Sequence, residues 1–389
     1  MVKKTTLPIN PDIFLFTGEA SGDLHGEALL QSLYAKRPDL SIFGVGGKRM
    51  RATPFQSILA MEKFQVMGFI DVFLALPKII QHFYFLRNQI LQSNPKIALF
   101  IDYPGFSLRM EKHLKKKGFQ GEIIHYICPS VWAWGKRRIS FLEKNTDLLL
   151  SIFPFEKSFF SPLFPVKYIG HPLVTRIKEA QIEPFPWAFG KKVISLFPGS
   201  RKKEIQRNFP LQLRALKTLL QHEGTLGAIS LSQEAYRPLL EELVQKEGLD
   251  PTKLKWINSK EIYGLMQHSF LAIAKSGTVT LELAFHAIPT VVLYATSKLD
   301  FWIAWHLLKI RLPFYCIVNI AAKKEVFKEF FGPYTTQENL NQEVLRLYQD
   351  TVYREGIKEL CAELLQSFGR ANSSAIAAEE LLSRLKKDD

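Results

Sequence analysis

The chain has 389 residues, of which 47% are hydrophobic and 23% are charged, and its formal net charge is +14. This length and composition exclude a disordered protein and are typical of two domains that each bury a core of ordinary size. The positive charge favours anionic partners, which include nucleic acid, an anionic lipid surface and a phosphorylated substrate. Charge alone does not choose among them.

Several classes of protein are disfavoured by simple patterns. The three cysteines, Cys128, Cys316 and Cys361, are far apart, so neither a disulfide framework nor a zinc spacing is expected, and a reducing, cytoplasmic setting fits best. Residues 1–10 lack an apolar stretch of signal-peptide length. The most hydrophobic region, 66–91, is interrupted by charged residues and a proline, so we expect it to lie on a membrane at most and not to cross one.

In the first half of the chain, short apolar runs alternate with helix-like segments. This alternation is typical of βα units and a mainly parallel sheet. Strands are expected at 13–17, 41–45, 97–102, 123–128, 148–153 and 166–170, and helices at 22–36, 68–93, 108–117 and 136–145. We therefore predict a doubly wound α/β domain over residues 1–182.

After a proline-rich stretch at 183–187, which we interpret as a linker, the same rhythm restarts. Strands are expected at 193–197, 226–231, 254–257, 271–275 and 291–294, with helices beginning near residues 204, 234, 261, 278 and 299. This predicts a second doubly wound domain at 190–345, followed by helices at 346–389 that pack back toward the first domain. Domains of this kind, facing a cleft, bind ligands beyond the carboxyl ends of their strands.

The loop Lys275-Ser276-Gly277-Thr278 joins an expected strand to an amphipathic helix. Free amides at a helix N-terminus favour phosphate, and Gly277 permits close approach of the backbone. Ser276 or Thr278 can add a hydroxyl hydrogen bond, and Glu282 could accept one from a ribose hydroxyl. A simple helix cap also explains the loop.

A second loop, Pro198-Gly199-Ser200-Arg201-Lys202-Lys203, places three cations where a helix usually begins with acidic residues, which suggests a bound anion. Arg201 could bind a phosphate through two hydrogen bonds and Ser200 could offer its amide and hydroxyl, whereas Lys202 and Lys203 are expected to be solvated. Together the two loops predict a diphosphate site.

The first domain offers other candidate groups. Asp102 follows an expected strand and could act as a general base, although an aspartate there also commonly caps a turn. The glycine-rich loop after the first strand matches neither a dinucleotide nor a Walker pattern. Its residues Glu19, Asp23 and His25 compete with Asp102 for the base role.

Two tryptophans, Trp132 and Trp134, stand beside the basic residues Arg137 and Arg138. They could pack in the core or line an acceptor site.

Six motifs in order resemble the lipid A disaccharide synthase family, and the resemblance runs from about residue 12 to about residue 330. They are Gly18-Glu-Ala-Ser-Gly-Asp23, Pro129-Ser-Val-Trp-Ala-Trp134, Phe153-Pro-Phe-Glu156, Ile169-Gly-His-Pro172, Pro198-Gly-Ser-Arg201 and Ser276-Gly-Thr278 with Glu282. The resemblance implies a GT-B hexosyltransferase that needs no metal or other cofactor. Its reaction would join UDP-2,3-diacylglucosamine to 2,3-diacylglucosamine 1-phosphate (lipid X), giving lipid A disaccharide 1-phosphate and UDP.

The resemblance also implies roles for individual residues. Asp102 resembles the family's base. The donor residues would be Ser200, Arg201, Ser276, Gly277, Thr278, Glu282 and Asn319. The acceptor residues would be Gly18, Glu19, Ser21, Gly22, Asp23, Trp132 and Trp134, and the membrane or acyl contacts would be Met67, Phe69, Val72, Phe73 and Leu76. After Asp102 this chain has Gly105 and Ser107 where the family has Asp and Asn, which puts a second carboxylate's role in doubt.

The implied setting is the cytoplasmic face of the inner membrane, where the protein would be peripheral on anionic phospholipids; a homodimer is also allowed. One alternative is another UDP-N-acetylglucosamine-using GT-B enzyme, either a transferase or an epimerase. The other alternative is a non-catalytic membrane or nucleic-acid-binding protein. No nucleic-acid motif accompanies the charge, so no nucleic acid partner is expected.

Overall fold

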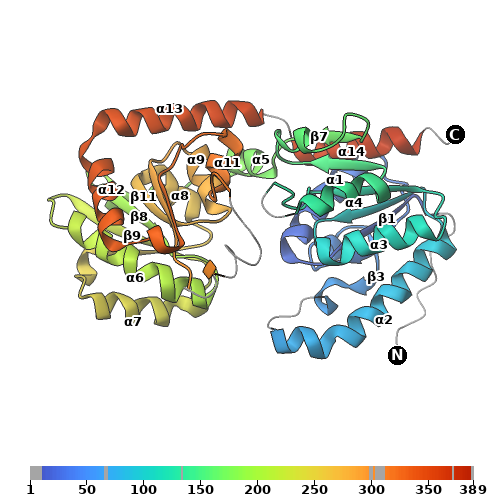
Figure 1. The fold of residues 1–389 in the computed structure, drawn as a ribbon, viewed down its shortest axis with the longest axis horizontal. Coiled ribbons are helices and arrows are strands. Elements are labelled where there is room, and N and C mark those ends of the chain that lie inside the picture. The colour runs from blue at the N-terminus through green and yellow to red at the C-terminus, as the bar shows by residue number, and fades with distance from the viewer. Residues whose placement is uncertain are drawn as a thin grey trace. The chain divides into compact units, whose positions relative to one another are not determined.

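The computed structural model describes residues 11–64, 69–132, 135–297, 301–302, 312–369 and 372–386. The chain forms two compact units, of which one comprises Met1–Thr175 with Arg370–Asp389 and the other Arg176–Gly369. The division between them falls inside helix α5, Pro172–Glu179. Figure 1 shows that each unit is a sheet flanked by helices.

The first unit is built on a seven-stranded parallel sheet in the order β3-β2-β1-β4-β5-β6-β7. The strands are β1 Ile13–Thr17, β2 Ile42–Gly46, β3 Gln56–Ala60, β4 Ile97–Ile101, β5 Glu122–Tyr126, β6 Leu148–Ser151 and β7 Val166–Tyr168. The strand order reverses between β1 and β4, where Thr17 and Ile101 are register partners. The loops that follow these two strands therefore lie at the switch point of the sheet, where open α/β sheets bind their ligands.

Helices cover both faces of this sheet because successive residues of a strand point to opposite sides. On β1, Ile13 and Leu15 pack against α1 (Ala20–Lys36) and the C-terminal helix α14 (Ser373–Leu385). Phe14 and Phe16 pack on the other face, against α2 (Phe69–Ser93) and α3 (Pro104–Lys116). Helix α4, Lys136–Asn145, contacts α3.

The second unit is built on a six-stranded parallel sheet in the order β10-β9-β8-β11-β12-β13. The strands are β8 Lys192–Phe197, β9 Thr225–Leu231, β10 Leu254–Asn258, β11 Ser269–Lys275, β12 Thr290–Tyr294 and β13 Glu329–Phe331. The order reverses between β8 and β11. The helices are α6 Lys202–Leu219, α7 Arg237–Glu247, α8 Ile262–His268, α9 Val279–Phe285, α11 Ile317–Ala322, α12 Gln337–Gln349 and α13 Thr351–Phe368.

The C-terminal helices are divided between the units. Helix α12 packs on α6 and helix α13 packs on α9, both in the second unit, whereas α14 packs on α1 in the first. Phe185, in the proline-rich stretch, is buried in the core of the second unit, where its ring stacks on those of Trp187 and His268. This stretch is therefore anchored to the second sheet.

The predicted fold class, two doubly wound parallel α/β sheets followed by C-terminal helices, is confirmed. Two edge strands, β3 and β13, were not predicted. The helix expected near residue 299 lies largely outside the described residues, as do Met67, Trp134 and the side chains of Phe69, Val72 and Phe73. Within the part of the chain that the structure describes, no helix combines the length and the apolar character needed to cross a membrane.

Candidate functional site

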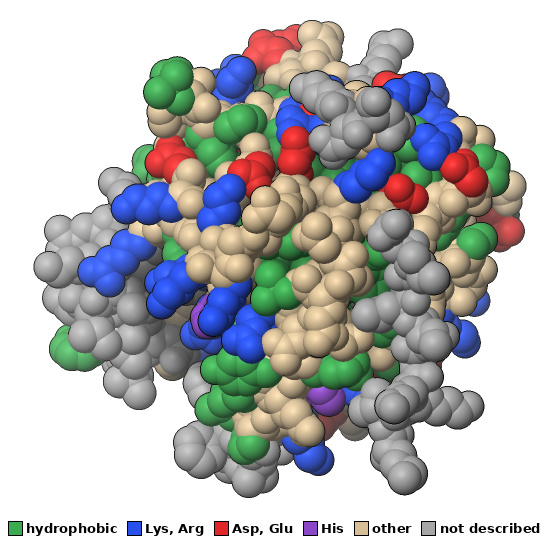
Figure 2. All heavy atoms as spheres, turned by 90° about the vertical axis from the view of Figure 1, so that its right-hand side faces the viewer, with side chains coloured by type: hydrophobic (Ala, Val, Ile, Leu, Met, Phe, Trp, Pro, Cys, Tyr) green, Lys and Arg blue, Asp and Glu red, His purple; other side chains and the backbone are tan. Residues whose placement is uncertain are grey.

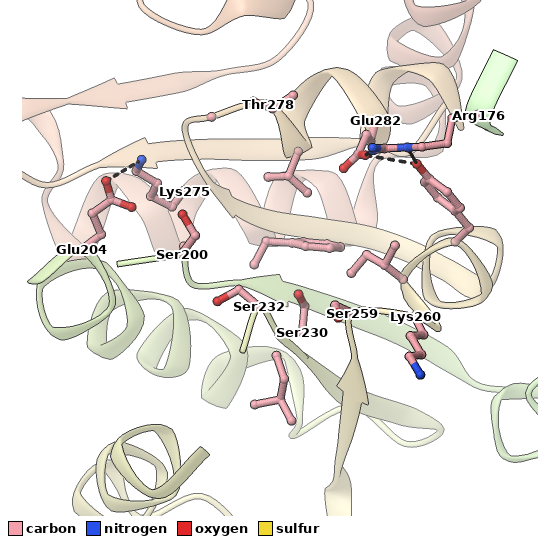
Figure 3. A pocket seen from close by; sticks show the side chains of 17 residues that line it. Arg176, Ser200, Glu204, Ser230, Ser232, Ser259, Lys260, Lys275, Thr278 and Glu282 are labelled. Carbon is pink, nitrogen blue, oxygen red and sulfur yellow. Dashed lines mark hydrogen bonds and ion pairs between the residues drawn. The ribbon is translucent and has the colours of Figure 1, made fainter. Parts of the chain in front are cut away.

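A cavity of about 570 Å³ opens in the second unit, at the carboxyl ends of β8, β9, β10 and β11 (Figure 3). It therefore lies at the switch point of the second sheet. Serines, two lysines and the Arg176 guanidinium give it polar walls, while Phe197, Leu231 and Ile262 give it apolar ones. It is lined by Arg176, Phe197, Gly199, Ser200, Glu204, Ser230, Leu231, Ser232, Ser259, Lys260, Ile262, Tyr263, Lys275, Gly277, Thr278, Val279 and Glu282.

The loop after β8 turns sharply at Gly199, whose φ of 116° is a conformation that side chains disfavour. A Cβ atom there would also approach the Glu204 carboxylate to 3.2 Å. The turn leads through Ser200 and Arg201 into α6, which begins at Lys202. It brings Gly199 and Ser200 to the cavity wall, next to the loop after β11: a Cβ atom on Gly199 would lie 3.6 Å from Lys275 Cδ.

Two cations at the cavity share one carboxylate. Oε1 of Glu204 lies 2.9 Å from Arg201 Nη1 and 3.2 Å from Lys275 Nζ. The Arg201 side chain is 78% exposed, whereas that of Lys275 is mostly buried. Burial lowers the pKa of Lys275, although the nearby Glu204 charge opposes that effect. The local charge is positive, which suits a phosphate group.

A second polar group stands at the Glu282 end of the cavity (Figure 3). Glu282 is buried, and its Oε1 accepts hydrogen bonds from Arg176 Nη2 and, at 3.2 Å, from the Tyr263 hydroxyl. Arg176 Nε donates to the same hydroxyl at 2.6 Å. Arg176 and Tyr263 were not predicted from the sequence, since neither stands in a motif.

The predicted donor residues divide into two groups. Ser200, Gly277, Thr278 and Glu282 line the cavity. Arg201 stands exposed beside it, and Ser276 continues the pairing of β11 through its amide, which donates to the Leu293 carbonyl at 2.9 Å.

Asn319 is fully buried on α11. Its side-chain oxygen accepts from the amides of Val326 and Phe327 at 2.9 and 3.0 Å, and its nitrogen donates to the Phe327 carbonyl at 2.8 Å. These bonds hold the segment that leads into β13.

In the first unit, Asp102 and Glu19 meet at the switch point, after β4 and β1. Asp102 and Tyr103 both have left-handed backbone angles, with φ of 50° and 53°, immediately before α3 begins at Pro104. Strain of this kind in residues other than glycine is concentrated at functional sites. Burial, together with the charge of Glu19 and a hydrogen bond to it, raises the pKa of Asp102 to about 6. A carboxyl with this pKa is ionised at neutral pH and is basic enough to accept a proton.

Other members of the first loop have local structural contacts. The buried Asp23 carboxylate accepts three backbone hydrogen bonds, from Gly47 at 2.8 Å, Arg49 at 3.0 Å and Met50 at 3.2 Å. A Cβ atom on Gly18 would lie 2.5 Å from the Tyr103 ring, and one on Gly22 would collide with the Thr17 hydroxyl. Ser21 donates to Oε1 of Glu19 at 2.8 Å.

Trp132 packs against the Phe155 ring, with centroids 6.2 Å apart. Nearby Glu156 is buried, and it accepts hydrogen bonds from the Ser151 hydroxyl at 2.7 Å and the Phe153 amide at 3.3 Å. Burial raises the pKa of Glu156 to about 7. Among the described residues, no three His, Cys, Asp or Glu side chains gather as a metal-binding group.

Sequence comparisons relate the chain to one family. The model of the family described as lipid-A-disaccharide synthetase matches residues 13–381. A lipid-A-disaccharide synthase of Chlamydia trachomatis serovar D is 36% identical over 387 residues, which are 97% of this chain and 62% of that protein. One of Azotobacter vinelandii is 33% identical over 379 residues, 95% of this chain and 97% of the relative. The chain thus spans less than two thirds of the length of the chlamydial relative.

Solved structures share the fold at low sequence identity. A putative UDP-N-acetylglucosamine 2-epimerase from Listeria monocytogenes superposes with a TM-score of 0.62 at 14% identity, covering 98% of this chain and 97% of that one. The spinosyn rhamnosyltransferase SpnG gives a TM-score of 0.56 at 12% identity, covering 95% and 99%. At such identities the likeness concerns the fold and leaves the chemistry to the site itself.

Proposed function

Because the chain belongs to the lipid-A-disaccharide synthetase family, we propose that it is an inverting hexosyltransferase that acts on acylated glucosamine. The donor is UDP-2,3-diacylglucosamine and the acceptor is 2,3-diacylglucosamine 1-phosphate. The products are lipid A disaccharide 1-phosphate and UDP. The observation that carries this proposal is the cavity at the β8–β11 switch point, which has the size and the polar groups that a nucleoside diphosphate requires.

We place the diphosphate of the donor between the loops after β8 and β11. Lys275 and Arg201 supply positive charge, and the amides near Gly199, Ser200 and Gly277 supply hydrogen-bond donors. The ribose lies at Glu282, whose second carboxylate oxygen has no hydrogen-bond partner among the described residues and can accept from a hydroxyl. Asn319 supports this pocket from the core through its contacts with Val326 and Phe327.

The reaction is a direct displacement. The 6-hydroxyl oxygen of the acceptor forms a bond to the anomeric carbon of the donor as the bond from that carbon to the diphosphate oxygen breaks. Asp102 takes the hydroxyl proton, and the cations beside the diphosphate stabilise the charge that develops on UDP. Glu19, in contact with Asp102, belongs to the acceptor side, together with Ser21 and Trp132.

The two departures from the family pattern near Asp102 have different structural settings. Ser107 is buried, and its hydroxyl donates to the Asp102 carbonyl at 2.7 Å, so it supports the turn that carries the base. At Gly105, a Cβ atom would meet nothing within 4 Å. The space there is open, so the structure leaves room for a side chain at this position.

The first unit also presents a surface suited to a membrane. On α2, Leu76, Ile80 and Tyr84 are 43%, 46% and 47% exposed, and their spacing of four residues places them along one stripe. The Arg87 guanidinium lies 4.8 Å from the centre of the Tyr84 ring. Figure 2 shows Lys and Arg side chains gathered beside hydrophobic ones on one face of the protein.

We propose that this helix lies in the interface of the inner membrane, on its cytoplasmic face, with basic side chains on anionic phospholipid headgroups. The predicted contacts Met67, Phe69, Val72 and Phe73 precede or begin the same helix. Co-sedimentation with vesicles of phosphatidylglycerol, compared with neutral phosphatidylcholine vesicles, tests this placement.

A homodimer is also proposed, and the mass of the protein in detergent-free solution tests it.

The decisive experiment for the activity is mass spectrometry of the products formed from the two diacylglucosamine substrates. We expect a disaccharide monophosphate with one equivalent of UDP. UDP-N-acetylglucosamine without acyl chains serves as the comparison donor. Transfer from it at the same rate, or its epimerisation, with no disaccharide formed from the acylated donor, would contradict the proposal.

A further inference from the structure

A fully buried histidine–glutamate pair lies behind the candidate base in the first unit. His125 on β5 and Glu111 on α3 have no exposed side-chain surface, and Nδ1 of His125 lies 2.6 Å from Oε1 of Glu111. Oε2 of Glu111 accepts a hydrogen bond from the Thr146 hydroxyl at 3.1 Å. A well-packed apolar pair would hold α3 on the sheet at least as well, because buried charges lose their hydration. The charges therefore require an explanation beyond packing.

The β4–α3–β5 connection brings this pair close to Asp102. Phe100 of β4 and His125 of β5 are register partners, and the Asp102 amide donates to the carbonyl of Tyr126 at 2.9 Å. Helix α3 starts two residues after Asp102 and carries Glu111 onto the sheet. Asp102 and His125 are near enough that the charge of each affects the pKa of the other.

With Asp102 as the base of the proposed function, we propose that His125 is its positioning residue. Glu111 keeps the imidazole of His125 protonated, and that positive charge keeps the Asp102 carboxyl ionised and ready to accept a proton. The proton removed from the acceptor hydroxyl ends on Asp102. His125 neither gives nor takes a proton in this scheme.

The charges around Asp102 support this role. Burial is the largest influence that raises the pKa of Asp102, and Glu19 at the start of α1 raises it further, whereas His125 on β5 lowers it. Tyr103, the other titratable neighbour in this loop, uses its hydroxyl to donate to the Phe64 carbonyl at 2.8 Å. Among the described residues, His125 is therefore the side chain whose positive charge lowers the pKa of Asp102.

The charges around His125 balance differently. Burial lowers the pKa of His125, because it disfavours the charged imidazolium. The charge and hydrogen bond of Glu111 raise the pKa, and so do the charge of Asp102 and a hydrogen bond to the backbone of Ile127. Together they outweigh burial, so the pKa of His125 is raised. Removing either His125 or its carboxylate partner takes the positive charge away. Burial and Glu19 would then be opposed only by the backbone hydrogen bond at Tyr103, and a larger fraction of Asp102 would hold a proton at neutral pH.

The test measures the pKa of Asp102 directly, by carbon NMR of the full-length protein labelled at the aspartate carboxyl carbon. The spectrum of Asp102→Asn identifies the resonance. We expect it to titrate about 1 pH unit higher in both His125→Gln and Glu111→Gln than in the wild type. The double variant should titrate at the same pH as the single variants, because either substitution alone removes the positive charge. The acid limb of kcat/KM should move by the same amount.

Thr146→Val is the matched control, because it removes a hydrogen bond from the same buried network and leaves both charges in place. It should lower the melting temperature without moving the Asp102 titration. UDP binding by calorimetry verifies that each variant is folded, and Glu111→Gln serves if His125→Gln does not fold. If the Asp102 pKa is unchanged in a folded variant, the proposed role of His125 is wrong. If Asp102→Asn turns over substrate like the wild type, Asp102 is not the base, but the NMR measurement of the effect of His125 on its pKa remains valid.

Discussion

Arg176 on α5 binds the carboxylate of Glu282 on α9 across 106 residues of sequence, and the two side chains face each other at one end of the cavity in Figure 3. The Tyr263 hydroxyl joins them, accepting from Arg176 Nε and donating to Glu282. The buried carboxylate is therefore neutralised on one oxygen before any ligand arrives. Its other oxygen can receive a ribose hydroxyl without leaving an unpaired charge in the cavity.

Replacing Arg176 with alanine should weaken UDP binding about tenfold, because the buried Glu282 would lose its charge partner beside an anionic ligand. Isothermal titration calorimetry with UDP measures the effect. Arg237→Ala is the matched control, since Arg237 pairs with Glu241 on the exposed surface of α7 and should leave the affinity unchanged. Equal affinities for Arg176→Ala and the wild type would show that the ion pair does not prepare the site.

Turnover should fall as the pH drops through about 6, since the pKa of Asp102 lies near that value. Under the proposed mechanism, the carboxyl is ionised above this pH and can accept the acceptor's proton. Below it the carboxyl is already protonated, and the rate should decrease about tenfold for each further pH unit. The dependence of kcat/KM on pH between 5 and 8 measures this limb. Asp102→Asn should abolish most turnover while sparing UDP affinity, and a pH-independent wild-type rate over this range would be incompatible with the assignment.

A substitution of Asp23 can show whether this residue of the first loop holds the fold or binds substrate. Its carboxylate accepts hydrogen bonds from three backbone amides in the segment after β2, and these bonds join that segment to α1. Asp23→Ala should therefore destabilise the first unit by about 2–4 kcal/mol. Urea unfolding followed by fluorescence measures the loss. Asp39→Ala, which removes an exposed pair with Arg37, should unfold like the wild type. A stable Asp23→Ala protein with weakened acceptor binding would instead make Asp23 a substrate contact.

The two sheets and the loops after β8 and β11 could be predicted, because both strands are apolar runs that end abruptly in small and polar residues. Strands β3 and β13 could not. The first begins with Gln56 and Ser57 and lies at a sheet edge, and the second is only three residues long, so neither shows a pattern distinct from a loop.

The pairs His125–Glu111 and Arg176–Glu282 could not be predicted from the sequence for a related reason. His125 stands inside an apolar strand, where a histidine has the pattern of a core residue, and its partner Glu111 lies on a helix rich in charged residues. Arg176 and Glu282 are brought together only when α5 and α9 pack in the second unit. Sequence reasoning identifies residues that stand in local motifs, whereas these contacts depend on tertiary folding.

A substitution at Gly277 can test the proposed phosphate-binding role of the loop after β11 without disturbing the fold of the loop. The φ of Gly277 is not in the left-handed region, and the nearest heavy atom to a Cβ placed there, the Lys275 carbonyl oxygen, is 3.9 Å away. The folded chain therefore tolerates a methyl group at this position, and Gly277→Ala should keep the wild-type melting temperature. If a diphosphate approaches this backbone closely, the same methyl group occupies the space of a phosphate oxygen, and UDP affinity should fall at least about tenfold. Gly356→Ala on α13, also in open space, is the control and should bind UDP normally. Unchanged affinity in Gly277→Ala would mean that the phosphates are held by Lys275 and the loop after β8, without close contact to Gly277.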